Sequence, residues 1–151
     1  MRKILCALAL LAFATPLLAK DPFAGTWTLN PAKAEYTIGT SAKNVTLVIE
    51  EQGPNLQVTA TGENSDGSPI SVKYMVPIKG GMGSVQAGDF DSVRTKQISE
   101  HVRENSFMKN GKELRSRRMI ISEDGKTMKS SQKGVNVAGK PVEGTDFFDK
   151  Q

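Results

Sequence analysis

Two arginines, Arg115 and Arg117, stand two residues apart in a segment, residues 112–122, that is expected to form a β-strand. Residues two apart on a β-strand point to the same face of the sheet, so their guanidinium groups would lie side by side. Planar guanidinium forks hold a carboxylate or a phosphate through paired hydrogen bonds. The spacing therefore predicts recognition of an anion, provided that this face points into the protein.

The turn dipeptides around this segment predict which residues accompany the arginines. Asn110-Gly111 is typical of a two-residue hairpin turn, and counting outward from it places Glu104 opposite Arg117. The same count from Asp124-Gly125 places Gln132 opposite Arg117 on the other side. We expect this face, apolar at one end and polar in the middle, to line the interior. Its other members are Val93, Thr95, Val102, Met108, Met119, Ile121, Met128 and Ser130.

The opposite face of the same strands is basic, and by this count it carries no acidic residue in the paired region. Charged residues rarely face a core unless they are paired, so we expect this face to be the outside. Its cations could meet an anionic surface of the cell envelope. Alternatively, they only keep exposed strands from aggregating. The residues are Arg94, Lys96, Arg103, Arg118, Lys129 and Lys133.

Two interpretations of the inner face remain open. In the first, Arg115 and Arg117 receive the anionic head of a small amphipathic ligand near Glu104, and Gln132 and Tyr74 are further ligand-binding residues. In the second, Glu104 and Arg117 form a plain cross-strand ion pair, worth roughly 0.2–1 kcal/mol. The methionines of this face suit either an adaptable binding surface or the filling of a core.

No pattern in the chain is typical of catalysis or of a metal site. His101 is the only histidine, and neither carboxylates nor further histidines accompany it at ligand spacing. A nucleophile–base set would also need a third group. The Gly-rich stretch 80–84 lacks the Lys-Ser/Thr ending of a phosphate-binding loop and is interpreted as a flexible connection. We therefore expect no enzymatic activity, no metal and no cofactor.

Residues 1–19 have the features of a secretory signal peptide. Two cations precede an apolar run that is too short for a membrane span, and cleavage fits after Ala19 or, alternatively, after Ala14. Cleavage also removes Cys6, the only cysteine, so no disulfide is expected. We expect a periplasmic or secreted protein in which residues 20–151 form one domain.

Short runs of alternating residues, separated by turn clusters such as NSDGSP and SEDGKT, fill this domain. No run has a convincing helical stripe. Sequential hairpins favour an all-β, antiparallel up-and-down barrel, because closure removes the exposed edges of a sheet. The nine expected strands cover residues 25–29, 44–51, 55–62, 70–76, 92–98, 101–109, 112–122, 127–134 and 142–149.

The stretch FAGTWTLNPAKAEY (23–36), the turns DGSP and DGKTM and the ending DKQ resemble lipocalin-like small secreted proteins of bacteria. In lipocalins, the Gly-x-Trp lies on the first strand and its Trp packs at the closed end of the barrel. The resemblance thus implies a lipocalin-like, or calycin-like, barrel of about eight or nine strands. It assigns structural roles to Gly25 and Trp27 and implies a carrier role without catalysis.

The expected function is therefore non-catalytic binding or transport of a small amphipathic, anionic ligand inside an exported barrel. The alternative is an envelope-associated interaction protein that uses its basic outer face and holds no internal ligand. Nucleic acid is not an expected partner, because removal of the signal segment leaves a net charge of about +2.

Overall fold

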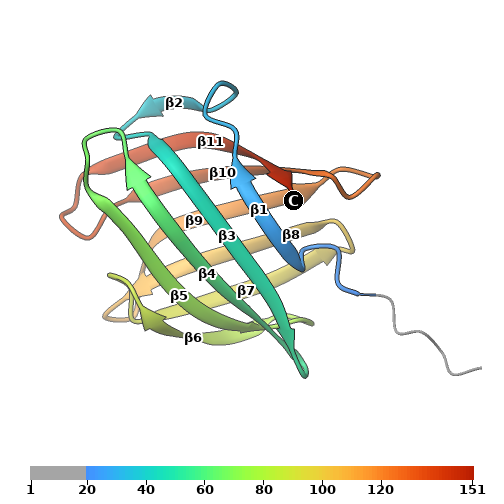
Figure 1. Ribbon diagram of the computed structural model, residues 1–151. Helices are drawn as coiled ribbons and strands as arrows, with labels where there is room; N and C mark the ends of the chain where they lie inside the picture. Colours follow the sequence, from blue (N-terminus) through green and yellow to red (C-terminus); the bar gives the residue numbers. More distant parts are fainter. Residues whose placement is uncertain (1–19) are drawn as a thin grey trace, which may run out of the picture.

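Eleven strands joined by short turns run antiparallel through residues 20–151, the part of the chain that the computed structural model describes (Figure 1). The expected signal segment, both cleavage sites and Cys6 lie outside the described residues. A helix suited to crossing a membrane is not found within 20–151. The strands are β1 (Gly25–Leu29), β2 (Glu35–Ile38), β3 (Ala42–Gln52), β4 (Asn55–Asn64), β5 (Pro69–Pro77), β6 (Gly81–Ala87), β7 (Ser92–Ser99), β8 (Val102–Lys109), β9 (Lys112–Ile121), β10 (Thr127–Val135) and β11 (Pro141–Lys150).

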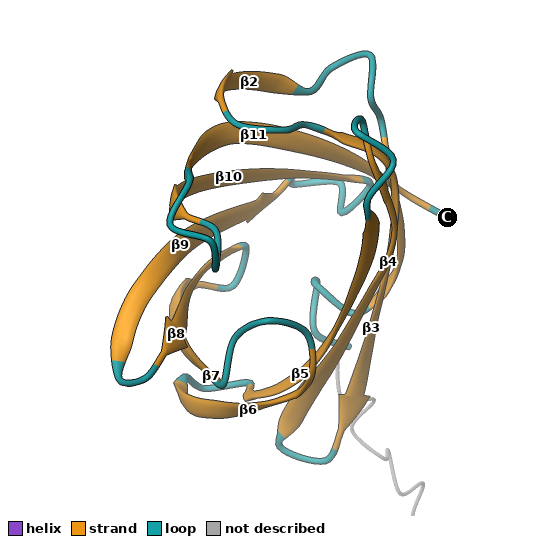
Figure 2. Ribbon diagram, turned by 90° about the vertical axis from the view of Figure 1, so that its left-hand side faces the viewer, coloured by secondary structure: helices purple, strands orange, loops and turns teal. Residues whose placement is uncertain are grey.

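Ten of these strands form a closed ring, which Figure 2 shows from its open end. The sheet order is β1-β3-β4-β5-β6-β7-β8-β9-β10-β11, and β1 pairs with β11 to close it. The remaining strand, β2, pairs with the first half of β11 outside the ring. The expected antiparallel up-and-down barrel is confirmed, although its ring has ten strands rather than eight or nine.

The nine-strand prediction misses β2 and β6, because neither has a strong local strand signal. The Gly-rich stretch 80–84, expected to be a flexible connection, lies largely within β6. Glycine weakens intrinsic strand preference, but here it allows close pairing. A Cβ at Gly83 would come within 2.1 Å of the Met75 carbonyl oxygen on β5. The partner strand, rather than the local sequence, therefore explains β6.

A β-bulge at Leu114 changes the register that the hairpin turn predicts for β8 and β9. Beyond the bulge, Phe107 pairs with Arg115, and Glu104 pairs with Arg118 instead of Arg117. One extra residue on β9 reverses the faces of β8, because side chains alternate along a strand. The expected register of β9 with β10 is confirmed by the pairs Ile121–Met128, Met119–Ser130 and Arg117–Gln132.

Gly134 on β10 lies beside this bulge and leaves no room for a side chain. Its φ is +144°, and a Cβ would stand 2.1 Å from the Leu114 carbonyl oxygen. Because this obstacle is backbone, we expect Gly134→Ala to lower the free energy of unfolding by about 1–3 kcal/mol in urea denaturation. Gly53→Ala is the control, because Gly53 has φ +60° but nothing within 4 Å of its Cβ position. Equal losses in both variants would contradict the importance of the close contact.

One end of the barrel is closed around Trp27, which is fully buried. Its indole Nε1 donates a hydrogen bond to the Phe23 carbonyl oxygen at 2.8 Å. Lys150, its partner on β11, places Nζ 4.8 Å from the ring centroid and donates to the Pro22 carbonyl oxygen at 3.2 Å. At Gly25 a Cβ would come within 2.6 Å of the Lys150 side chain. The segment before β1 is thereby held as a plug under the barrel.

Candidate ligand-binding cavity

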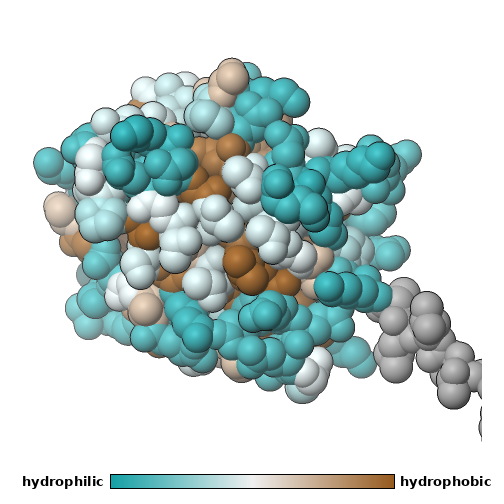
Figure 3. Space-filling view, viewed as in Figure 1, coloured by the Kyte–Doolittle hydropathy of each residue, from teal (hydrophilic) through white to brown (hydrophobic). Residues whose placement is uncertain are grey.

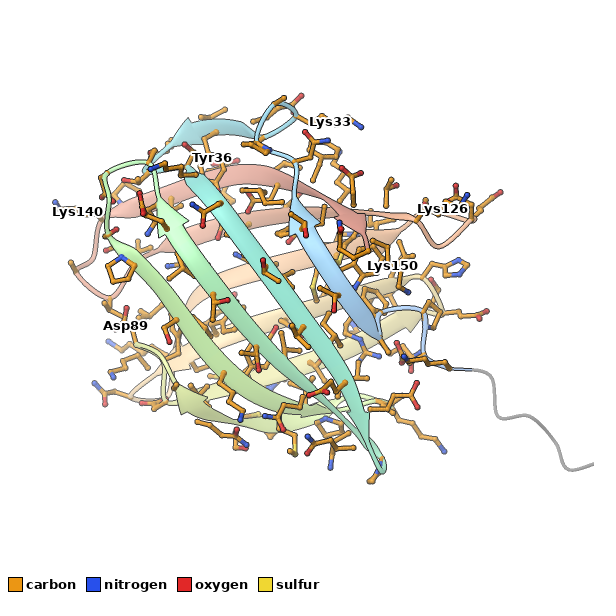
Figure 4. All side chains as sticks on the ribbon, viewed as in Figure 1. Lys33, Tyr36, Asp89, Lys126, Lys140 and Lys150 are labelled. Carbon is orange, nitrogen blue, oxygen red and sulfur yellow. The ribbon has the colours of Figure 1, made fainter. Side chains whose placement is uncertain are left out.

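A cavity of about 540 Å³ lies inside the barrel, between this plug and the loops at the opposite end. Phe23 and Phe148 line it near the plug, whereas Asp89 and Lys140 line it at the open end. Figure 4 shows Asp89, Lys140 and Tyr36 at one end of the molecule, with Lys126 and Lys150 at the other. The volume falls within the roughly 300–1,000 Å³ of typical small-molecule sites.

One wall of the cavity is apolar and comes from β3, β4 and β5. On these strands, the inward positions alternate with outward positions that are largely polar or small. Figure 3, which looks onto the outside of β1, β3 and β4, accordingly shows mostly hydrophilic and pale residues with a few apolar ones between them. The inward aliphatic residues are Val45, Leu47, Ile49, Leu56, Val58, Ala60, Ile70, Val72 and Val76.

The opposite wall is polar and comes from β8 to β11, with one residue from β2. In the ten-strand ring, β9 is five places from β4, so the two walls face each other across the cavity (Figure 2). The polar residues lining the cavity on this side are Tyr36, Arg103, Asn105, Arg115, Arg117, Gln132 and Asp146.

A chain of hydrogen bonds connects the two arginines to a buried carboxylate. Arg117 Nη2 and Arg115 Nη1 donate to Gln132 Oε1 at 3.0 and 3.4 Å. Gln132 Nε2 donates to the Tyr36 hydroxyl at 2.7 Å, and that hydroxyl donates to the Asp146 carboxylate at 3.0 Å. The arginines therefore share one neutral amide oxygen, and Asp146 interacts with them through two intervening groups.

Burial changes the acidity of these groups. Burial, followed by the neighbouring Arg117 charge, lowers the pKa of Arg115 to about 10. Burial, followed by the nearby Asp146 charge, raises the pKa of Tyr36 to about 12. The pKa of Asp146 is also raised, chiefly because its carboxyl is buried. Each direction reflects the cost of holding a charge away from water.

Several polar atoms of this wall have no hydrogen-bond partner among residues 20–151. They are the Nε atoms of Arg103, Arg115 and Arg117, and Oδ1 of Asn105, whose Nδ2 bonds to the Tyr74 hydroxyl at 3.1 Å. The carboxylates of Asp146 and, at the open end, Asp89 line the same cavity, but neither the Arg115 nor the Arg117 guanidinium lies within salt-bridge distance of an acid in the described range. The wall can therefore accept an anion and further hydrogen bonds.

Arg103 was expected on the outer face of the sheet, but the bulge on β9 turns its side chain into the barrel. Its side chain is 2% exposed, stacks 5.3 Å from the centroid of Phe23 and donates to the Ile78 carbonyl oxygen at 3.0 Å. Its Nη2 lies 3.5 Å from Asp21 Oδ2 in a buried ion pair. Arg103 thus anchors the plug segment instead of adding to an exterior basic surface.

Glu104 was expected on the inner face, but the same bulge turns its side chain to the outside of the barrel. It points outward, its side chain is 40% exposed, and it forms an ion pair with Arg118. The structure therefore brings four of the five candidate residues to the cavity and excludes Glu104 from it. The four that line the cavity are Tyr74, Arg115, Arg117 and Gln132.

Three residues of the polar wall were not singled out from the sequence. Asp146 shares the inward face of β11 with Phe148, and the alternation in the expected strand 142–149 contained that signal. Asn105 can be assigned to the cavity wall only when the bulge on β9 is known, because the bulge reverses the faces of β8. Tyr36 lies on β2, whose partner β11 is distant in the sequence, so no local pattern could reveal it.

No group of three or more His, Cys, Asp or Glu side chains within 20–151 could hold a metal ion.

Comparison with known proteins identifies no family for this chain. No family model matches the chain, and no curated protein matches it significantly. A solved structure described as a redesigned β-barrel, mFAP1, bound to DFHBI, aligns with a TM-score of 0.45 and 13% identity. That alignment covers 85% of this chain and 95% of the other.

Proposed function

We propose that the protein binds a small amphipathic anion in its cavity and acts as a non-catalytic, lipocalin-like carrier outside the cytoplasm. One observation carries the proposal: the guanidinium groups of Arg115 and Arg117 line the cavity and donate to the amide oxygen of Gln132, and Arg115 also lies over the Phe90 ring, but neither has an acidic partner within salt-bridge distance among residues 20–151. A cation held away from water without an acidic partner is costly for the fold. Such an arrangement is understandable where a ligand supplies the anion.

The energetics of the two walls support the same conclusion. A hydrogen bond to a charged group contributes about 1.5–3 kcal/mol, so a carboxylate or sulfate between the guanidinium groups would gain substantially. Hydrocarbon placed on the opposite wall, for example against Leu47 and Val58, gains about 25 cal/mol for each Å² removed from water. Both halves of an amphipathic molecule would therefore be stabilised.

The lipocalin-like part of the proposal is supported by the closed end of the barrel. Trp27 on the first strand is covered by a cationic side chain of the last strand, Lys150. The proposed export is supported by the sequence features of residues 1–19.

The alternative function, contact with an anionic envelope surface, has less support than the sequence suggests. Arg103 is turned into the barrel, and Glu104 is turned out beside Arg118. The outer face therefore has one cation fewer and one carboxylate more than expected. We favour the internal ligand for this reason.

The test is calorimetric titration of residues 20–151 with dodecanoate and with dodecyltrimethylammonium, both below their micelle concentrations. The two probes have the same alkyl tail and opposite charges. We expect dodecanoate to bind at least about tenfold more tightly, because only its head can replace the missing partner of the arginines. Failure of dodecanoate to bind, or equal binding of the two probes, would contradict the proposal.

A further inference from the structure

The geometry points to a more specific ligand class: a rigid anion with one hydroxylated face and one hydrocarbon face, lying flat between the two walls. This inference rests on the proposed function.

Polarity in this cavity is divided between opposite walls rather than between its two ends. The inward positions of β4, which are Leu56, Val58 and Ala60, are apolar along the cavity. Across from them, β8 carries Arg103 near the plug and then Asn105. The β4 wall is therefore apolar along the cavity, whereas the wall on β8 to β11 carries polar side chains at successive levels among the apolar Phe107, Met119 and Phe148.

A ligand with a polar head and a simple tail fits this division poorly. Its tail would lie along the polar wall as well as the apolar one. Asn105 Oδ1, in a side chain that is 1% exposed, would then be covered by hydrocarbon without a partner. Leaving a buried acceptor unsatisfied costs about 1–3 kcal/mol. A ligand with a polar face avoids this cost.

The polar wall offers both donors and acceptors, which indicates hydroxyl groups in addition to an anion. Arg115 and Arg117 can only donate, whereas Asn105 Oδ1 and the Asp146 carboxylate can accept. A carboxylate ligand group satisfies the donors alone. A hydroxyl group donates and accepts at once, so hydroxyls beside the anion would complete the wall.

Rigidity follows from the shape of the aliphatic wall. The side chains of Leu47, Val58 and Val72 are short and present a broad hydrocarbon surface to the cavity. A fused ring system can cover such a surface without losing rotamer freedom, whereas a flexible chain loses about 0.5–1.5 kcal/mol for each ordered segment of comparable freedom. A flat ring system with methyl groups on one face therefore suits the wall best.

Two steroid carboxylates, chenodeoxycholate and ursodeoxycholate, test the inference on the unmodified protein. They have the same composition and charge and differ only in the 7-hydroxyl, which lies on the hydroxylated face in the first and on the methyl-bearing face in the second. We expect chenodeoxycholate to bind at least about tenfold more tightly in calorimetry, because the second epimer places a hydroxyl against the aliphatic wall.

Two variants test whether the preference for chenodeoxycholate over ursodeoxycholate arises at the polar wall. Asn105→Leu keeps the side-chain size but removes the acceptor, so we expect the ratio of the two affinities to fall to about threefold or less. Ser106→Ala, at the adjacent outward position of β8, is the control and should leave the ratio unchanged.

The outcomes separate the inference from the proposed function. If dodecanoate binds but the epimers bind equally, or ursodeoxycholate binds better, the facial inference is wrong and anion binding stands. If neither dodecanoate nor the steroids bind, the proposed function itself is overturned. A preference for chenodeoxycholate that Asn105→Leu leaves intact would contradict the placement of the hydroxylated face.

Discussion

Trp27→Ala is expected to lower the free energy of unfolding by about 3–5 kcal/mol. The indole is fully buried where β1 meets β11, and it contacts the plug segment through its hydrogen bond to Phe23. Truncation would leave a cavity bounded by strands that cannot collapse inward, because both are paired on each side. It would also free the plug at the point where the chain enters the barrel.

Chemical denaturation followed by circular dichroism measures this loss, since the variant lacks the only tryptophan of the chain. Lys150→Met is the matched control, because it keeps an unbranched stem over the indole and removes the charge. A cation–π contact contributes about 0.5–2 kcal/mol, so the control should lose less. If Lys150→Met lost as much as Trp27→Ala, the charge rather than the packing would hold this end together.

Much of the barrel could be predicted because short stretches of neighbouring residues indicate its strands and turns. Alternating runs revealed β3, β4 and β5, and counting outward from Asp124-Gly125 gave the register that places Gln132 beside Arg117. Two members of the candidate site therefore follow from counting along one hairpin.

The bulge at Leu114 could not be predicted from the turn beside it, and it makes its close contact with another strand. The carbonyl oxygen of Leu114 occupies the space that a side chain at Gly134 would need. No count outward from the turn contains that contact. One bulge on β9 was enough to exchange Glu104 with Asn105 at the cavity wall.

The contribution of β2 to the cavity could not be predicted from the sequence for a similar reason. Three of its four residues pair with β11, more than a hundred positions later in the chain, and this pairing places Tyr36 beside Gln132 and Asp146. Long-range pairing of this kind leaves no periodic signal in a segment so short.

Arg117→Leu is expected to weaken dodecanoate binding at least about thirtyfold, or roughly 2 kcal/mol. The substitution removes the guanidinium with the shortest bond to Gln132 and leaves Arg115 as the nearest cation. The same substitution should strengthen binding of dodecyltrimethylammonium, since it removes a repulsive charge near the Asp146 carboxylate.

Stability distinguishes this loss of affinity from misfolding. Replacing a cation with incomplete partners by a residue of similar apolar bulk is often neutral or stabilising, because the desolvation cost disappears. We therefore expect the free energy of unfolding of Arg117→Leu to equal or exceed that of the unmodified protein in urea. Lost affinity together with a large loss of stability would point to a structural role for the arginine.

Glu104→Gln is the control that tests the register as well as the site. Without the bulge on β9, this carboxylate would lie beside Arg117, and its removal would then change the affinity for an anion strongly. In the structure, Glu104 lies outside and pairs with Arg118, an exposed interaction worth about 0–1 kcal/mol. We therefore expect the dodecanoate affinity of Glu104→Gln to be unchanged. A change comparable to that of Arg117→Leu would show that β8 presents its other face to the cavity.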